Sequence, residues 1–186
     1  RLTRGRHYVS AWDAVAGPRG SSRFAYLRST PTELPDLWVQ DGAGRPRRLT
    51  AFNDDVLADL ALSTPVERRS EVDGRVIQGW YLPPAATAPA PSGPAASTAT
   101  TRPTPGAVPG PHPLVTEIHG GPHTVYGWSP VWEFQILAAS GMGVFYCNPR
   151  GSEGYGEAFN DANHRDWGPG PMRDVLAGVD ALVAAG

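Results

Sequence analysis

From Leu114 onward, the chain alternates short apolar segments with segments of helical periodicity. Leu114–Ile118 and Val144–Asn148 have the length and composition of strands buried in a sheet. A helix is expected to begin between them at Ser129-Pro130, because serine caps helices and proline suits the first helical position. A second helix is predicted from Pro171 on. Its apolar face would consist of Met172, Val175, Leu176, Val179, Leu182 and Val183. This order of elements predicts a parallel βαβ arrangement, and therefore an α/β fold class.

The residues before this region carry short strands separated by turns. Within residues 6–50, strand-like runs recur at roughly ten-residue spacing, which is typical of antiparallel sheet. These runs are His7–Trp12, Arg23–Leu27 and Asp36–Gln40. Residues 51–65 are interpreted as a connector in which Asn53 caps a short helix. Asp73-Gly74 lies between two further extended runs and predicts a hairpin.

Residues 83–112 differ in composition from the rest of the chain. They are rich in proline, alanine and threonine, with Arg102 as the one charged side chain and Val108 as the one large aliphatic side chain. Such a segment buries too little apolar area to offset the entropy of ordering it. We therefore expect a surface insertion here.

Charge and cysteine content exclude several classes of protein. The formal net charge is −2, so no strong field favours nucleic acid or an anionic membrane as partner. No apolar run is long enough to span a membrane. Cys147 is the single cysteine, which excludes an internal disulfide and fits a reducing, cytoplasmic compartment. The chain begins Arg1-Leu2 without a signal segment, which is interpreted as an internal cut.

The segment Ile118–Pro122 is the strongest indication of catalysis. The predicted strand runs directly into Gly120 and Gly121, which would present backbone N–H groups at the carboxyl end of the strand. Such groups stabilise the oxyanion of acyl transfer, and α/β-hydrolases take one donor from a His-Gly-Gly loop. The ring of His119 is expected to support this loop by hydrogen bonds. The chain contains no Gly-x-Ser-x-Gly elbow, so no catalytic nucleophile, acid or histidine is assigned to residues 1–186.

Two ligand-binding alternatives are disfavoured. Zinc could be held by Glu117, His119, His123 and Cys147, but the Gly-Gly-Pro between the histidines prevents the helix that would align them. The glycines of Gly151–Gly156 stand in the reverse order of a dinucleotide fingerprint, which favours a tight loop over a phosphate site.

Arg150 follows the second predicted strand, where open α/β sheets bind ligands. We favour an ion pair with Glu153 or Asp174 over contact with substrate.

Taken together, these motifs resemble the prolyl oligopeptidase family, in its acylaminoacyl-peptidase and dipeptidyl-peptidase-like branch. The most specific element is the Asn-Pro-Arg-Gly-Ser-x-Gly-Tyr-Gly string at Asn148–Gly156, which follows His-Gly-Gly-Pro. Upstream, Arg48–Asn53 and Asp73–Trp80 look like that branch's passage from the last propeller blade into the hydrolase domain. The resemblance covers residues 7–82 and 113–186.

The resemblance implies the N-terminal part of an α/β-hydrolase domain preceded by the last β-propeller blade. Residues 1–50 would form the end of the propeller, and residues 51–65 would connect the propeller to the hydrolase domain. Residues 66–186 would form the N-terminal part of the hydrolase domain, with the insertion at 83–112. It also implies a serine peptidase for short peptides, without metal or organic cofactor. Its Ser-Asp-His triad would lie beyond residue 186, so this fragment is expected to be inactive.

Within this chain, the resemblance transfers one functional element: the oxyanion donor at Gly121, with Gly120 beside it. An esterase or lipase-like hydrolase and a non-catalytic hydrolase-like binding module stay open as alternatives. The oligomeric state stays open too.

Overall fold

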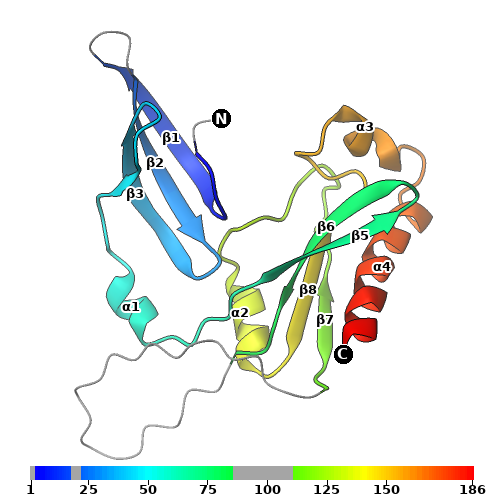
Figure 1. The fold of residues 1–186 in the computed structure, drawn as a ribbon. Coiled ribbons are helices and arrows are strands. Elements are labelled where there is room, and N and C mark those ends of the chain that lie inside the picture. The colour runs from blue at the N-terminus through cyan, green and yellow to red at the C-terminus, as the bar shows by residue number, and fades with distance from the viewer. Residues whose placement is uncertain (1–2, 18–21, 86–110) are drawn as a thin grey trace, which may run out of the picture. The chain divides into compact units, whose positions relative to one another are not determined.

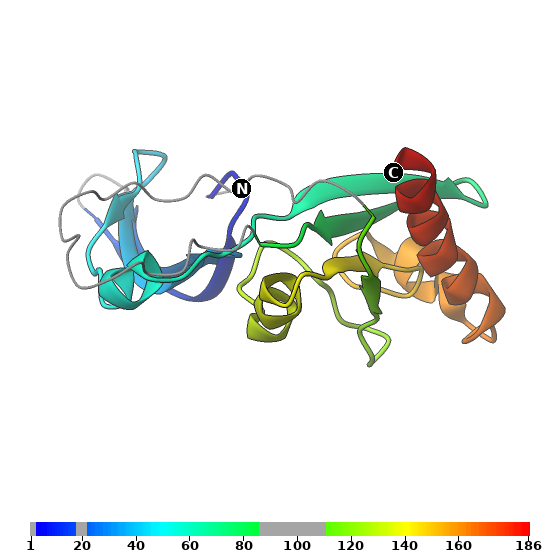
Figure 2. The same cartoon turned by 90° about the horizontal axis from the view of Figure 1, so that it is seen from below.

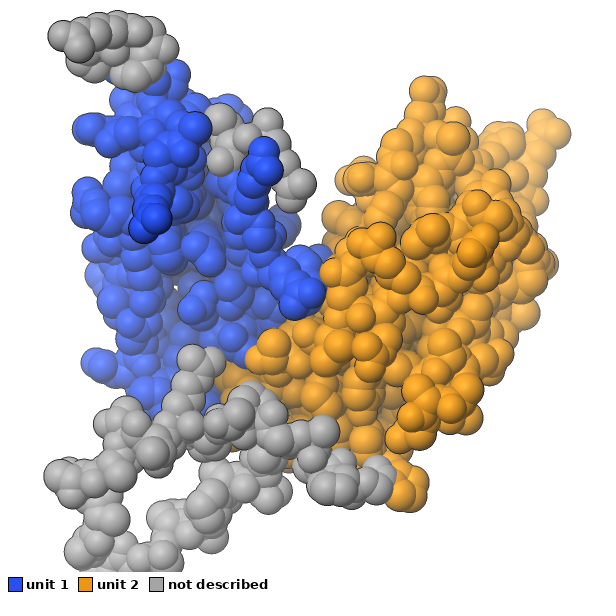
Figure 3. Space-filling model, viewed as in Figure 1, with its two compact units in different colours: residues 1–60, 127–131 blue, residues 61–126, 132–186 orange. Residues whose placement is uncertain are grey.

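The computed structural model describes residues 3–17, 22–85 and 111–186 (Figure 1). They form two compact units, which Figure 3 colours separately. Unit 1 comprises residues 1–60 and 127–131, and unit 2 comprises residues 61–126 and 132–186. The division after residue 60 falls inside the predicted connector. Of the predicted insertion, residues 86–110 lie outside the described residues.

Unit 1 is built on one antiparallel sheet in the order β1-β2-β3-β4. Its strands are β1 (Tyr8–Ala16), β2 (Ser22–Thr30), β3 (Glu33–Asp41) and β4 (Arg47–Arg48). The three predicted strands are confirmed and are longer than predicted. Strand β4 was not predicted, because two residues are too few to give a recognisable sequence pattern. The short helix α1 (Asp54–Ala58) follows, with Asn53 at its N-cap position but without a capping side-chain hydrogen bond.

Unit 2 is built on a mixed sheet in the order β5-β6-β8-β7. Its strands are β5 (Val66–Val72), β6 (Arg75–Leu82), β7 (Leu114–Glu117) and β8 (Gly143–Asn148). The predicted hairpin is confirmed as β5 and β6, which turn at Asp73-Gly74. Strand β6 runs antiparallel to β8, and β7 runs parallel to β8. Because helix α2 (Trp132–Ala139) connects β7 to β8, the predicted parallel βαβ arrangement is confirmed.

Helices α2 and α4 (Pro169–Ala185) pack on opposite faces of this sheet (Figure 2). Strand β8 contacts both helices, because its alternate residues point to opposite sides of the sheet. Phe145 and Cys147 form a buried cluster with Val175 of α4. Tyr146 faces the other way and lies 4.7 Å, between ring centroids, from Phe134 of α2. The short helices α3 (Glu157–Asn160) and η2 (Asp161–Asn163) lie between β8 and α4. None of the helices in the described ranges has both the length and the apolarity needed to cross a membrane.

The contact face of α4 agrees with the predicted apolar face only in part, at Val175, Val179 and Leu182. The helix begins at Pro169, two residues before the predicted start, and its buried residues are Gly170, Asp174, Val175 and Gly178. Three residues of the predicted face are instead exposed: Met172, Leu176 and Val183. Small side chains allow α4 to approach β8 closely, so packing rather than apolar spacing determines which face is covered.

Substitution of Gly178 with alanine is expected to destabilise unit 2 by about 1–3 kcal/mol, as overpacked cores do. A Cβ atom at this position would overlap the ring of Phe145, which is itself buried. This clash outweighs the gain of about 1 kcal/mol in helix propensity. Urea unfolding of Gly178→Ala measures the effect, and Gly168→Ala is the control because nothing lies within 4 Å of its added Cβ. A gain in stability for Gly178→Ala would contradict this account.

Candidate active site

Gly120 and Gly121 lie in an exposed loop directly after β7. Gly121 has a φ of +114°, a conformation that residues with a Cβ rarely adopt. Among the described residues, neither glycine N–H has a hydrogen-bond partner. The loop therefore presents free backbone donors at the carboxyl end of a parallel strand.

The turn after β8 holds this loop at several points. The side-chain amide of Asn148 accepts a hydrogen bond from the Tyr126 N–H (2.8 Å) and donates one to the Tyr126 carbonyl (2.9 Å). The Glu153 N–H donates to the Thr124 carbonyl (3.0 Å). The Ser152 hydroxyl lies 3.0 Å from Nε2 of His119. The loop after β7 is thus hydrogen-bonded to the end of β8 and its following turn at His119, Thr124 and Tyr126.

These bonds also bear on the phosphate alternative for Gly151–Gly156. A phosphate site needs free backbone N–H groups. The N–H groups of Gly151 and Ser152 instead donate to the carbonyls of Phe159 (2.9 Å) and Pro149 (3.1 Å), and that of Glu153 is also engaged. The first half of this segment is therefore a closed structural turn.

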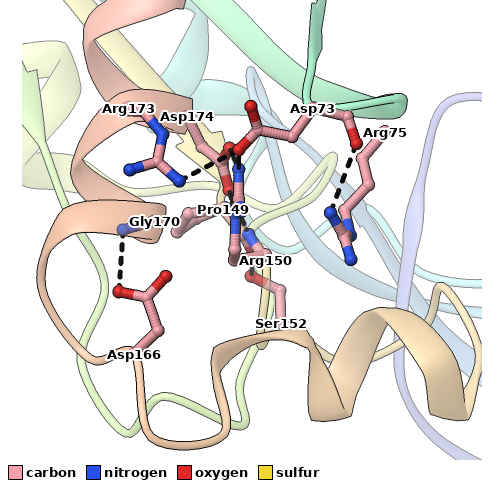
Figure 4. Close-up of polar contacts among 9 residues, drawn as sticks. All are labelled: Asp73, Arg75, Pro149, Arg150, Ser152, Asp166, Gly170, Arg173 and Asp174. Atoms are coloured by element: carbon pink, nitrogen blue, oxygen red, sulfur yellow. Dashed lines mark hydrogen bonds and ion pairs between the residues drawn. The ribbon is translucent and has the colours of Figure 1, made fainter.

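Arg150 of the same turn belongs to an ion-pair network in which its pair with Asp174 is buried (Figure 4). Its guanidinium donates to both carboxylate oxygens of Asp174, at 2.9 and 2.7 Å, and its backbone N–H donates to the same carboxylate at 2.8 Å. Asp174 is fully buried in α4 and Arg150 is 5% exposed. The predicted pair with Asp174 is present. Arg150 also bonds Asp73 of the β5–β6 turn (2.8 Å), which Arg173 contacts as well (3.0 Å).

The network stabilises the charged forms of Asp73 and Arg150. Hydrogen bonding to Arg150, and then to Arg173, lowers the pKa of Asp73. Hydrogen bonding to Asp174 raises the pKa of Arg150, against the opposing effect of burial. Arg150 consequently directs its Nε, Nη2 and backbone N–H donors at carboxylates of this chain, which fits an anchoring role for the turn.

The residues of the zinc alternative do not converge. In the described part of the chain, no three His, Cys, Asp or Glu side chains gather in a group that could hold a metal ion. Cys147 is buried in the cluster beneath α4. Burial also raises the pKa of its thiol to about 12, which fits a neutral thiol packed in this apolar cluster.

Comparison with known proteins identifies the family. The family model described as prolyl oligopeptidase family matches residues 128–186. Uncharacterized peptidase YuxL of Bacillus subtilis (strain 168) is 36% identical over 138 residues, which are 74% of this chain and 18% of that protein. The chain belongs to the prolyl oligopeptidase family. Dipeptidyl-peptidase 5 of Schizosaccharomyces pombe is 39% identical over 73 residues, which are 38% of this chain and 11% of that protein.

Solved structures agree with the assignment to the prolyl oligopeptidase family. Pyrococcus horikoshii acylaminoacyl peptidase matches with a TM-score of 0.78 and 25% identity, over 99% of this chain and 25% of that chain. A puromycin-hydrolyzing peptidase of Mycobacterium tuberculosis matches with a TM-score of 0.64 and 25% identity, over 88% and 23% respectively. The fold class is therefore confirmed: unit 1 carries a propeller-like sheet and unit 2 the beginning of an α/β-hydrolase domain. The chain spans about a quarter or less of each of these proteins.

Several residues that build this candidate site were not identified from the sequence as contributing to it. Asp73 was interpreted only as a turn residue, yet it bonds Arg150 across 77 positions. Asn148 and Ser152 belonged to the family string without an assigned role, and they bond residues 22 and 33 positions away. The only signal in the sequence was that Asn148 and Ser152 lie at and just after the end of a buried strand.

Glu117, the last residue of β7, gives a pH-dependent prediction. Burial, and then the nearby Glu133 carboxylate, raise the pKa of Glu117. The folded protein thus keeps this proton at pH values where the unfolded chain loses it. Stability therefore falls as the pH rises from the ordinary glutamate range through the raised pKa. Glu117→Gln is expected to raise Tm at about pH 8, with the gain shrinking toward about pH 4.

Calorimetry of both proteins across this pH range measures the effect. Glu157→Gln, at an exposed position, is the control. A gain that stays constant or grows on acidification would contradict the assignment.

Proposed function

We propose that this chain is part of a serine peptidase that hydrolyses peptide bonds in short peptides, with the Gly121 N–H as one oxyanion donor. The observation that carries the proposal is the free N–H of Gly121, held at the carboxyl end of β7 by the turn after β8. Gly120 precedes it in the same exposed loop. Family membership supports the reaction class, and the names of the relatives, dipeptidyl-peptidase and acylaminoacyl peptidase, support peptide substrates.

In the proposed mechanism, a serine beyond residue 186 attacks the substrate carbonyl carbon while a histidine accepts the serine proton. The carbonyl oxygen becomes an oxyanion that accepts a hydrogen bond from the Gly121 N–H. The histidine then donates the proton to the leaving amine, and water hydrolyses the acyl-enzyme. An aspartate, also beyond residue 186, orients the histidine. The reaction as proposed needs neither metal nor organic cofactor.

The proposal includes the domain organisation. Residues 1–50 end a β-propeller, residues 51–65 connect, and residues 66–186 begin the hydrolase domain with an insertion at 83–112. His119 and Arg150 support the oxyanion loop and the adjacent turn, respectively. The described contacts of both residues fit these roles.

Assays of the full-length protein test the proposal. It should hydrolyse peptide anilides, and a fluorophosphonate should label one serine outside residues 1–186 and abolish turnover. The 186-residue chain alone should be neither labelled nor active. Hydrolysis of esters without hydrolysis of peptides would indicate an esterase or lipase-like enzyme. Absence of both labelling and turnover would indicate a non-catalytic binding module.

A further inference from the structure

Ser152 has hydrogen bonds that determine which nitrogen of His119 carries a proton. Its side chain is 1% exposed, and its Oγ lies 2.6 Å from the carbonyl oxygen of Pro149. A carbonyl oxygen only accepts, so the single hydroxyl hydrogen of Ser152 is committed to that bond. The Ser152 Oγ can then only accept from Nε2 of His119, which is 3.0 Å away. Nε2 of His119 therefore carries the proton, and in the neutral ring Nδ1 does not.

The same ring lies against the peptide group that carries the oxyanion donor. Nδ1 of His119 is 3.4 Å from the carbonyl oxygen of Gly120. That carbonyl and the Gly121 N–H belong to one planar peptide unit and point in opposite directions, so they rotate together. Since a carbonyl oxygen only accepts, a hydrogen bond at this contact requires a proton on Nδ1. With Nδ1 unprotonated, two lone pairs face each other, and the Gly120 carbonyl gains nothing by turning toward the ring. If Nδ1 carried the proton, it would donate to that carbonyl and rotate the Gly121 N–H with it.

The geometry points to Ser152 as a positioning residue for the oxyanion donor, acting through His119: it keeps His119 protonated at Nε2 and so prevents His119 from capturing the Gly120 carbonyl. This inference rests on the proposed function, because it assigns Ser152 to that same oxyanion site.

The surroundings of Ser152 suit this role. Arg150, two residues earlier, is fixed by its bonds to Asp174. The intervening Gly151 carbonyl accepts a hydrogen bond from Asn160 (3.1 Å). On the other side, the ring of Tyr126 meets the His119 ring edge-on, at 5.0 Å between centroids. The imidazole is therefore held in place by packing, and loss of the Ser152 hydroxyl changes its proton position more readily than its location.

Ser152→Ala in the full-length protein tests the inference. The kcat for a peptide anilide is expected to fall about tenfold with KM changed less than about twofold, because an oxyanion contact strengthens only in the transition state. Ser152→Thr keeps the hydroxyl and should retain most of the activity. The matched control is Ser63→Ala, because the buried Ser63 also donates to a proline carbonyl, that of Pro83, at 2.6 Å. It should leave kcat unchanged.

A second readout does not depend on turnover. In the full-length protein labelled with 15N-histidine, the His119 signals are assigned by their loss in His119→Gln. They should show the Nε2–H tautomer in the wild type and in Ser152→Thr, and a shift toward Nδ1–H in Ser152→Ala. An active enzyme whose Ser152→Ala variant keeps both kcat and the tautomer overturns the inference alone. A wild-type protein without any peptidase turnover overturns the proposed function.

Discussion

Replacing Gly121 with alanine is expected to lower kcat/KM for a peptide substrate about a hundredfold or more. The φ of +114° at Gly121 is unfavourable for a residue with a Cβ, so the alanine variant relieves the strain by rotating the adjoining peptide. Space is not the limitation, because the added Cβ would meet Thr124 at an ordinary 3.5 Å. Rotation moves the N–H away from the oxyanion, and loss of such a donor typically costs about 10²–10³-fold in rate.

The control for this prediction is Gly141→Ala. Gly141 also has a positive φ, +85°, with no atom within 4 Å of an added Cβ, but it lies in the turn between α2 and β8. Both variants should lose a similar amount of stability, about 1–2 kcal/mol. Only Gly121→Ala should lose activity. Steady-state kinetics of the full-length protein measure the loss of activity in each variant. Equal losses of kcat/KM in both variants would show that backbone strain, and not a lost oxyanion donor, lowers the activity.

Replacing Arg150 with methionine is expected to lower the free energy of unfolding of unit 2 by about 3–5 kcal/mol, as removal of one partner from a buried ion pair does. The substitution leaves the fully buried Asp174 carboxylate without the guanidinium that pairs with it. It also removes the bond between Arg150 and Asp73, so that Asp73 keeps only its contact with Arg173 of α4. Urea unfolding followed by circular dichroism measures the loss.

Two further variants separate charge burial from loss of packing. Arg150→Met combined with Asp174→Leu removes both charges and should recover part of the stability lost in the single variant. Arg23→Ala breaks the exposed pair with Asp41 in unit 1 and should leave the unfolding midpoint unchanged. A double variant less stable than Arg150→Met alone would mean that the network contributes more than the mutual neutralisation of its charges.

The elements of unit 2 could be predicted because each is encoded over a short stretch. Strand β8 has an uninterrupted apolar run, and the hairpin has an Asp-Gly turn between extended segments. The covered face of α4 could not be predicted in the same way. Gly178 is buried against the ring of Phe145 because it has no side chain, and this contact depends on a residue of another element.

In the candidate site, too, residues that act locally could be predicted and residues that act through distant partners could not. Gly120 and Gly121 could be identified from the sequence because backbone donors at a strand end depend only on local residues. The residues that hold them could not, since each acts through a partner far away in the chain. Asn148 and Ser152 become meaningful only once β7 and β8 lie side by side and bring their following loops together.

The clamp formed by Asn148 has a consequence for the chemical ageing of the protein. Asparagine deamidates when the backbone nitrogen of the next residue attacks the side-chain amide, and Pro149 supplies a nitrogen without the hydrogen this requires. Conversion to aspartate would replace the donor that reaches the Tyr126 carbonyl and the Tyr155 hydroxyl by an acceptor. Deamidation of Asn148 would weaken its hydrogen bonds to the loop, and Pro149 blocks the usual route of that reaction.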